Sequence, residues 1–479
     1  MKKATVIIKR LEAAHQKTSF TSFQPLSKEM RKDISLKVKE IFDALGDSQL
    51  LKSSREVYIK PNAVDAKAYS FTRPEVLEAV INYFKQAGAG KIFLMENATQ
   101  ANYTRLVFRG TGYTKLCRKT GAIPVFLDEE TSETLKFSDT IPERDGRETP
   151  YDLGTFEMPA TVMKLIRERD QHLYINVPKL KTHSMGVVTL GVKNQWGFPM
   201  HRSRGLDHNY NLHHKLVDVL GYIRPDVTLI EGVEGTIHGH YFATALADEQ
   251  VKPFRVLIAS KNVVAADMTG AKIFGLEVTD VPHLEYAIKR GLSDGVNRLE
   301  HIDIKGDITD ISTIDLLGDR PENKAYPWDL YPRFPEDVAI IKGREMACRE
   351  GCVNNPLCTM QTMYLDRGGK GGFTIVMGKG FDQREIDAIT GRVLIVGHCA
   401  ISETAEGLIQ RLGRRKVYLS DECNNLCDTA QALFHLMHVN PAFYVPVNPL
   451  VAFYEMNMAK LKGSSSRVPN PFCHLIKMV

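Results

Sequence analysis

Residues 173–183 read Leu-Tyr-Ile-Asn-Val-Pro-Lys-Leu-Lys-Thr-His, and this stretch decides how the chain is expected to fold. Its first five residues are mostly apolar and predict a short buried strand. Pro178 ends that strand because it has no backbone N–H to donate, and lysines, a threonine and a histidine follow at once. In open α/β sheets the residues just after the carboxyl ends of strands line the ligand crevice. The stretch therefore predicts a sheet strand that delivers charged side chains to a site.

The same alternation extends through the N-terminal part of the chain. Apolar residues recur with helical spacing over residues 74–86 and again over about residues 263–274. Short apolar runs separated by helices of this length predict βαβ units and a mostly parallel sheet. Residues 128–155 are polar and turn-rich, and they are predicted to be an excursion from the sheet. The predicted strands are residues 57–60, 91–95, 122–127, 173–177, 227–230 and 255–259.

A change of composition divides the chain. Residues 318–336 contain four prolines and show neither helical nor strand periodicity. We therefore predict an α/β domain over residues 1–317, a proline-rich linker over residues 318–336, and a smaller, Rossmann-like α/β domain over residues 337–479. The strand-like runs of this second domain are residues 338–341, 373–377, 393–396 and 416–419, with helical segments between them.

Composition excludes several classes of protein. With 43% hydrophobic and 25% charged residues, the chain is neither disordered nor fibrous. No apolar run approaches the roughly 20 residues that span a bilayer, and the first apolar stretch is too short for a signal peptide. A net charge of +5 is small for 479 residues, so no nucleic-acid partner is expected. We expect a cytoplasmic protein with no membrane partner.

Two of the predicted strands end in matching chemistry. Lys60-Pro-Asn62 follows one strand, and the segment from Pro178 to His183 follows another. Lysine supplies a compact positive charge, so these residues suit a small anionic ligand. His183 is the favoured proton-transfer group. Glu231, after a third strand, is expected to orient the catalytic group or to relay a proton. The predicted anion-binding residues are Lys60, Asn62, Lys179, Lys181, Lys193 and Asn194. The alternative is a basic surface loop with scattered histidines and no ligand.

These motifs carry a resemblance to a known family. The residues of this chain that carry the resemblance are Lys60-Pro-Asn62, Thr72-Arg-Pro-Glu75, the block from Pro178 to His183, Lys193-Asn194 with Gly197, and Asp267 before Gly275. Over about residues 50–295 the chain resembles the family catalogued as domain of unknown function 362. The resemblance implies an α/β fold and an association with iron–sulphur clusters, although this chain has no C-x-x-C-x-x-C run and has Glu231-Gly232 where the family usually has Asp-Gly. A distant similarity to nickel-pincer lactate racemases implies a further alternative, an isomerase.

Cysteine placement is uneven, since seven of the eight thiols lie beyond residue 347. Six of them form three groups, each after a predicted strand of the second domain, so parallel strands would bring these groups to one edge of the sheet. Iron–sulphur clusters are held by cysteine thiolates. The predicted metal ligands are Cys348, Cys352, Cys399, Cys423 and Cys427, whereas Cys117 and Cys473 are predicted to be structural.

Two alternatives to an iron–sulphur cluster stay open. Zinc would accept the two C-x3-C pairs but would leave Cys399 unexplained, and buried thiols without metal are common. The leading hypothesis is an anaerobic iron–sulphur protein, with a 4Fe–4S cluster, acting on a small anion as an oxidoreductase or a cluster-dependent lyase or isomerase. It would be served by an electron-donor protein. The alternatives are an electron-transfer or cluster-carrier protein without its own substrate, and a zinc-stabilised α/β binding protein.

Overall fold

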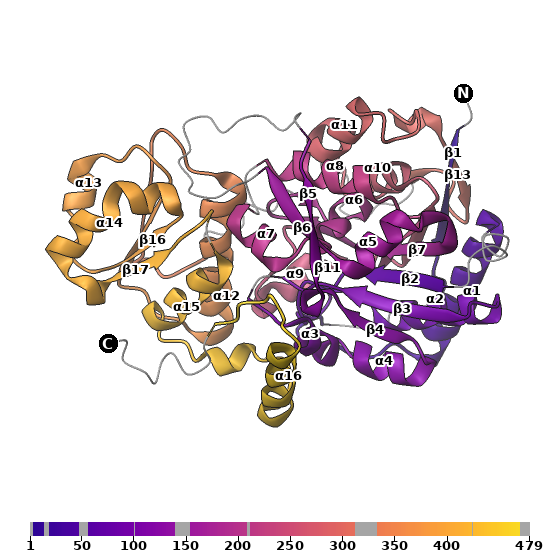
Figure 1. The fold of residues 1–479 in the computed structure, drawn as a ribbon, viewed down its shortest axis with the longest axis horizontal. Coiled ribbons are helices and arrows are strands. Elements are labelled where there is room, and N and C mark those ends of the chain that lie inside the picture. The colour runs from indigo at the N-terminus through magenta and orange to yellow at the C-terminus, as the bar shows by residue number, and fades with distance from the viewer. Residues whose placement is uncertain are drawn as a thin grey trace.

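A large, mostly parallel sheet forms the first unit of the computed structural model (Figure 1). The structure describes residues 3–13, 19–46, 56–99, 101–138, 154–207, 211–311, 333–423 and 425–469. Along its main path the strand order is β13-β1-β12-β10-β7-β2-β3-β4. The strands are β1 (Ala4–Arg10), β2 (Glu56–Pro61), β3 (Lys91–Glu96), β4 (Ile123–Phe126), β7 (His172–Val177), β10 (Val227–Thr236), β12 (Val256–Ser260) and β13 (Ile302–Gly306).

Helices cover both faces of this sheet, which confirms the predicted α/β class. Alternate residues of a strand point to opposite faces, and Val6 and Ile8 of β1 accordingly join one apolar core while Ile7 joins the other. The second core contains α1 (Lys28–Leu45) and α2 (Pro74–Gln86). The first contains α8 (Leu212–Tyr222), α10 (Val263–Ile273) and α11 (Pro282–Lys289). The helix α2 has the bounds that the apolar spacing predicts.

One predicted strand departs from the parallel pattern. The strand β12 runs antiparallel to both of its neighbours, β10 and β1. Between β10 and β12 the only α-helix is α9 (Ala247–Gln250), which is too short to serve as a crossover helix for a parallel pair. The predicted excursion contains an antiparallel pair, β5 (Ser132–Lys136) and β6 (Thr155–Pro159), and its residues 139–153 lie outside the described residues.

The second sheet is smaller and fully parallel, in the order β14-β15-β16-β17. Its strands are β14 (Ala339–Lys342), β15 (Phe373–Met377), β16 (Arg392–Val396) and β17 (Val417–Ser420), within one or two residues of the predicted runs. On one face pack α12 (Asn354–Arg367) and α15 (Leu426–Leu436), and on the other pack α13 (Gln383–Asp387) and α14 (His398–Leu412). Helices on both faces of a parallel sheet give the Rossmann-like layering that the sequence predicts.

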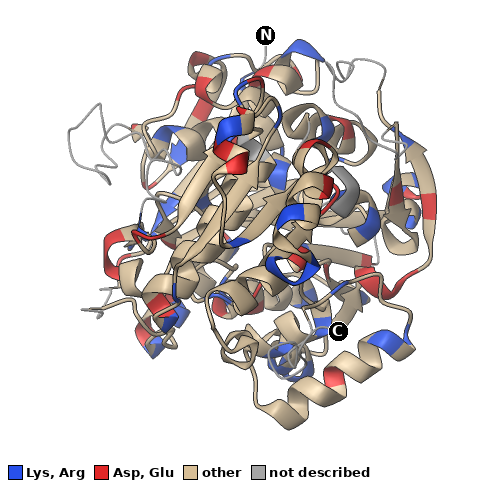
Figure 2. Ribbon diagram, turned by 90° about the vertical axis from the view of Figure 1, so that its left-hand side faces the viewer, with Lys and Arg blue, Asp and Glu red and all other residues tan. Residues whose placement is uncertain are grey.

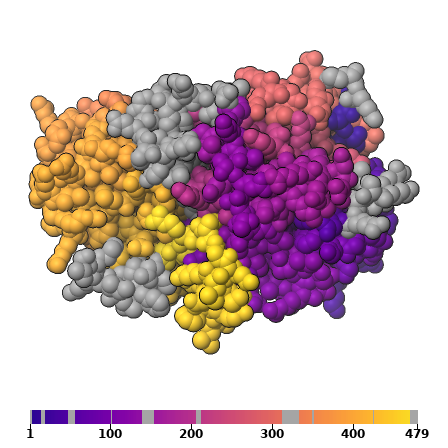
Figure 3. Space-filling view, in the orientation of Figure 1, coloured from indigo at the N-terminus to yellow at the C-terminus, as the bar shows by residue number. Residues whose placement is uncertain are grey.

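The last described segment of the chain returns to the first unit. The helix α16 (Pro449–Leu461) packs against α3 (Thr104–Gly110), and Glu455 pairs with Arg109 at 2.5 Å (Figures 1 and 3). After α16, the Ser466 hydroxyl donates to Asp128 at 3.2 Å. Residues 318–332 of the predicted linker lie outside the described residues. Among the described helices, none combines the length and apolar character needed to cross a bilayer.

A buried ion pair joins α2 to the sheet. The Arg73 guanidinium donates two hydrogen bonds of 2.6 Å to the Glu234 carboxylate of β10, and both side chains are almost fully buried. Such a bidentate pair fixes both the distance between the guanidinium and the carboxylate and their relative orientation. The start of α2, which follows the Lys60-Pro-Asn62 strand end, is therefore held against β10.

Replacing Glu234 with Gln should destabilise the fold by about 3 kcal/mol, because the Arg73 charge would remain buried without its main partner. The matched control is Glu133→Gln, which breaks an exposed pair with Arg167 and should cost under about 1 kcal/mol. Urea unfolding followed by circular dichroism measures both. Equal effects of the two substitutions would contradict a structural role for the buried pair.

Candidate functional site

Four predicted anion-binding lysines lie inside the protein at the carboxyl edge of the large sheet. Lys and Arg residues are interspersed with Asp and Glu over the ribbon (Figure 2), but Lys60, Lys179 and Lys181 are at most 1% exposed and Lys193 is 7% exposed. Lys60 lies near the end of β2, Lys193 lies in the short helix α6 (Gly191–Asn194), and the others lie in β8 (Lys179–His183). Burying a charge is costly unless it is paired, so the partners of these lysines decide what they can do.

Two of the lysines are neutralised by carboxylates. Lys60 Nζ donates to Glu96 at 2.5 Å, and Lys179 Nζ donates to both oxygens of Glu231 at 2.9 and 2.7 Å. Glu231 also accepts from the backbone N–H of Arg73 at 3.1 Å. Burial raises the pKa of Glu231 and lowers that of Lys60. Glu231 thus positions Lys179, while its catalytic role stays a prediction.

The other two lysines have no carboxylate within salt-bridge distance among the described residues. Lys181 Nζ donates to the Ser70 carbonyl. Burial lowers the pKa of both Lys181 and Lys193 to about 7, and further cations add to the effect at Lys193, namely Lys181, Arg204 and Lys60. A bound anion would favour the charged ammonium form of these lysines. The arrangement therefore suits a small anion.

Buried polar atoms without a hydrogen-bond partner in the described structure gather in the same loops. Buried polar groups are nearly always paired, and each exception calls for an explanation such as a water or a ligand. These atoms come from the segments that follow β2, β3 and β8. They are Asn62 Oδ1, Asn97 Oδ1, Thr189 Oγ1, Gln195 Oε1 and Nε2, His201 Nδ1 and Arg204 Nε.

Asparagines and one aspartate fix the backbone around the lysines. Asn62 donates to Asn194 Oδ1 at 2.8 Å, and Asn194 donates to Asn176 Oδ1 at 2.7 Å. Asp267 of α10 accepts from the backbone N–H of Gly191 at 2.6 Å and that of Val192 at 2.8 Å. Asp267 therefore holds the start of α6, and with it Lys193. Burial raises the pKa of Asp267 to about 7.

His183 ends β8 and is held by its own turn. Its Nδ1 accepts from the backbone N–H groups of Met185 at 3.0 Å and Gly186 at 3.1 Å. The ring stacks on His240, with centroids 3.8 Å apart and planes 3° apart. Since Nδ1 accepts, the proton of the neutral ring lies on Nε2, and His183 presents an N–H donor there. Its part in proton transfer stays a prediction.

Two carboxylates of this site are not predicted from the sequence. Glu96, at the end of β3, pairs with Lys60. Asp65 is buried and interacts electrostatically with Lys181. The strand-end rule that selects Lys60 applies equally to Glu96, which follows the apolar run of residues 92–95. No comparable signal in the sequence indicates Asp65.

In the second sheet, four of the five predicted cysteines lie close together. A hydrogen bond with Cys348, burial, and the proximity of Cys423 and Cys399 raise the pKa of Cys352 well above its usual range. These thiols follow β14, β16 and β17, at one edge of the parallel sheet. Cys427 is not among the groups with the largest effects on the pKa of Cys352, and burial raises the pKa of Cys427 to about 12.

The cysteine thiols lie near one another, but they do not form a metal site in the described structure. Among the described residues, no three His, Cys, Asp or Glu side chains are arranged to hold a single metal ion. Gly397, at φ +88°, allows a close approach, because a Cβ there would lie 2.8 Å from Cys352 Sγ. An all-thiol donor set fits iron–sulphur or zinc rather than a hard cation.

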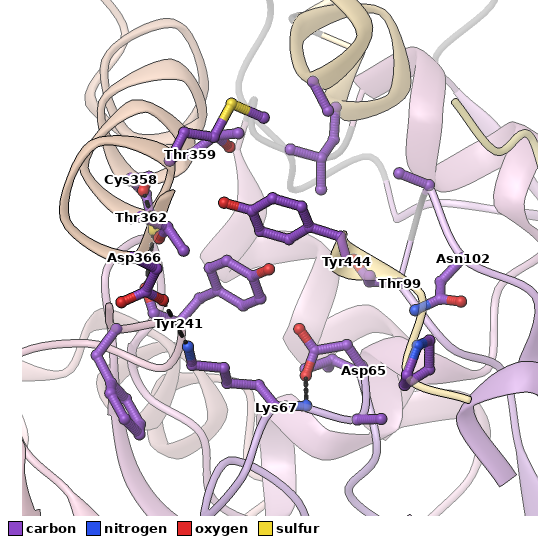
Figure 4. Close-up of a pocket in the computed structure, with 18 of the residues that line it drawn as sticks. Asp65, Lys67, Thr99, Asn102, Tyr241, Cys358, Thr359, Thr362, Asp366 and Tyr444 are labelled. Atoms are coloured by element: carbon purple, nitrogen blue, oxygen red, sulfur yellow. Dashed lines mark hydrogen bonds and ion pairs between the residues drawn. The ribbon is translucent and has the colours of Figure 1, made fainter. Parts of the chain in front are cut away.

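The two units meet at a cavity of about 400 Å³, which is lined by neighbours of the predicted site residues rather than by those residues themselves (Figure 4). Ser184 and His240 line it from the first unit, and Asn354 and Cys358 line it from α12 of the second. The Asn354 amide donates to the Ser184 carbonyl at 3.4 Å. Because Asn354 comes two residues after Cys352 and Ser184 follows His183, the two predicted sites adjoin each other.

A family model matches the part of the chain that carries the first unit's motifs. Residues 57–272 match the family described as "Domain of unknown function (DUF362)". A thylakoid-associated protein of Synechocystis sp. is 26% identical over 264 residues, which cover 52% of this chain and 72% of that protein. A crystal structure of a protein from Thermotoga maritima is 12% identical with a TM-score of 0.35, covering 87% of this chain and 83% of the other.

Replacing Lys193 with Met should change how stability depends on pH. The folded-state pKa of Lys193 is about 7 against an ordinary value of 10.5, so the unfolded chain binds more protons between those pH values. The free energy of unfolding of the natural protein therefore gains a rising contribution over that range. Lys193→Met should reduce the slope by up to about 1.4 kcal/mol per pH unit.

Urea unfolding at pH 7 to 10 measures this slope. Lys39→Met serves as the control, because Lys39 lies on the surface of α1 with its side chain 61% exposed. An unchanged slope in Lys193→Met would show that Lys193 is charged in the folded protein.

Proposed function

We propose, from the premise that this chain belongs to the DUF362 family over residues 57–272, that it is a cytoplasmic iron–sulphur protein acting on a small anion. The observation that carries the proposal is the proximity of Cys348, Cys399 and Cys423 to Cys352. Three separate strand-end loops supply these thiols, which is how a parallel sheet can assemble a site from distant parts of a sequence.

The cluster would be held by Cys348, Cys352, Cys399 and Cys423. Cys348 rather than Cys427 is the fourth ligand in this proposal, because Cys348 is hydrogen-bonded to Cys352. Cys399 lies in the first turn of α14, where the helix dipole favours a thiolate. When bound, a 4Fe–4S cluster would supply one-electron redox chemistry or Lewis acidity.

The anion would bind at the buried lysines of the first unit. Lys181 and Lys193 supply charge that no described carboxylate neutralises by a salt bridge, whereas Lys60 and Lys179 are held by Glu96 and Glu231. His183 would donate its Nε2 proton in a hydrogen bond to the anion, because its Nδ1 is occupied by two backbone N–H groups. In this proposal Glu231 acts by orienting Lys179.

The neighbouring positions of the two sites support a single reaction centre. The hydrogen bond between Asn354 and Ser184 joins the segment after Cys352 to the segment after His183. A substrate held at the end of β8 would therefore lie close to the cysteine loop. An external electron-donor protein would complete an oxidoreductase of this kind.

Protein purified without oxygen should be brown and contain about four iron and four sulphide ions per chain. Cys352→Ser and Cys399→Ser should lose most of that iron, since each removes a proposed ligand. Cys117→Ser and Cys427→Ser are matched controls that should keep it. Visible absorption and iron and sulphide analysis provide the measurements.

Two results would contradict the proposal. A colourless protein with one zinc ion per chain would favour the zinc-stabilised alternative. Equal iron loss in Cys427→Ser and Cys352→Ser would place the cluster elsewhere. If the iron is present but Lys193→Met leaves turnover and anion binding unchanged, an electron carrier without its own substrate is the better description.

A further inference from the structure

The cavity between the two units has features that the anion site does not explain. Its volume of about 400 Å³ falls within the range of roughly 300–1,000 Å³ that small-molecule sites occupy. The residues that line it do not include Lys60, Lys181 or Lys193. The chemical class of the ligand must therefore be inferred from the residues that line the cavity.

Charges inside the cavity favour a positive or hydrogen-bond-donating ligand. Its inner lining holds two carboxylates, Asp65 and Asp366, and one ammonium group, Lys67. Lys67 Nζ pairs with Asp366 at 3.2 Å and donates to Thr244 at 2.7 Å. Asp366 also accepts from the backbone N–H groups of Thr244 and Ala245. This pair is neutral overall, so Asp65 is the carboxylate of the inner lining that forms no salt bridge with a described residue. Arg367, the other cation of the lining, is exposed.

Asp65 presents an oxygen to the cavity. Its Oδ1 accepts from the Lys67 backbone N–H at 2.7 Å and from the Ser70 hydroxyl at 3.3 Å, whereas Oδ2 accepts no hydrogen bond from a described residue. The residue is 9% exposed, and its carboxylate points into the space below Tyr444 (Figure 4). Lys181 acts on Asp65 electrostatically but does not line the cavity. A buried carboxylate oxygen of this kind recognises N–H donors.

Aromatic side chains form much of the remaining wall. Rings of this kind stack on planar ligands and attract cations through their faces. The Lys67 ammonium already lies 5.9 Å from the Tyr241 ring centroid and 5.5 Å from that of Phe242. The aromatic residues of the lining are Phe20, Tyr241, Phe242, Phe434, Phe443 and Tyr444.

We propose that this cavity binds an aromatic amine, with its ring among the aromatic side chains and its N–H donor on Asp65 Oδ2. The walls come from both units, with Asp65, Tyr241 and Phe242 on one side and Phe434, Phe443 and Tyr444 on the other. Such a ligand therefore contacts both units at once. The site is separate from the buried lysines and does not depend on a metal cluster.

Two probes of the same ring system distinguish this ligand class from the anion of the proposed function. Tryptamine carries an ammonium group on an indole, and indole-3-propionate carries a carboxylate on the same ring. Calorimetry on the full chain, purified without oxygen, should show tryptamine binding at least roughly tenfold more tightly than indole-3-propionate, because one charge-assisted hydrogen bond is worth about that factor.

Asp65→Asn keeps the acceptor for the Lys67 N–H and removes the charge. It should reduce the preference for tryptamine to within about threefold. Glu133→Gln changes a surface carboxylate that does not line the cavity, and it should leave the preference intact. Tighter binding of indole-3-propionate, or no binding of either probe at millimolar concentration, would overturn the inference. Because the comparison of the two probes uses the natural protein, it stands even if Asp65→Asn does not fold.

Discussion

The salt bridge between Lys179 and Glu231 is the interaction on which the first site depends. Lys179 begins β8 and pairs in register with Glu231 of β10, so the ion pair lies where the two strands meet. Both side chains are fully buried, and a buried charge is stable only with its partner in place. Downstream of this contact, β8 delivers Lys181 and His183 to the interior. The same carboxylate accepts from the Arg73 backbone N–H, so the start of α2 is fixed by the same group.

Two parallel-strand edges then produce the functional arrangement. In the first unit the buried charged residues lie near the ends of β2 and β3 and along β8, which follows β7, and in the second unit β14, β16 and β17 precede the cysteines. The contact between Asn354 and Ser184 brings these edges together. The return of α16 to α3, held by the Glu455–Arg109 pair, further joins the units. The cavity between the two edges follows from this arrangement.

The apolar runs of the sequence predict most of the strands because local patterning determines them. The run of residues 57–60 becomes β2, and the four runs of the second unit become its four strands. The grouping of Cys348, Cys352, Cys399 and Cys423 also follows from strand order. Cys117 is buried, in agreement with its predicted structural role. Cys473 lies outside the described residues.

Pattern alone does not reveal how far a charge is buried or which partner neutralises it. Lysines at strand ends are usually solvated, yet Lys179 and Lys181 are fully buried because carboxylates or carbonyls from other strands and loops reach them. The antiparallel direction of β12 is likewise a tertiary result, since its apolar run would suit either direction. The place of Asp65 in a binding site is visible only in the folded structure, where it lines a cavity formed by residues of both units.

Anomalous diffraction at the iron absorption edge, from crystals grown without oxygen, tests the central claim most directly. We expect a single strong peak enclosed by the sulphur atoms of Cys348, Cys352, Cys399 and Cys423. A peak beside Cys427 instead, a peak that appears at the zinc edge and not at the iron edge, or no peak at these thiols would contradict it.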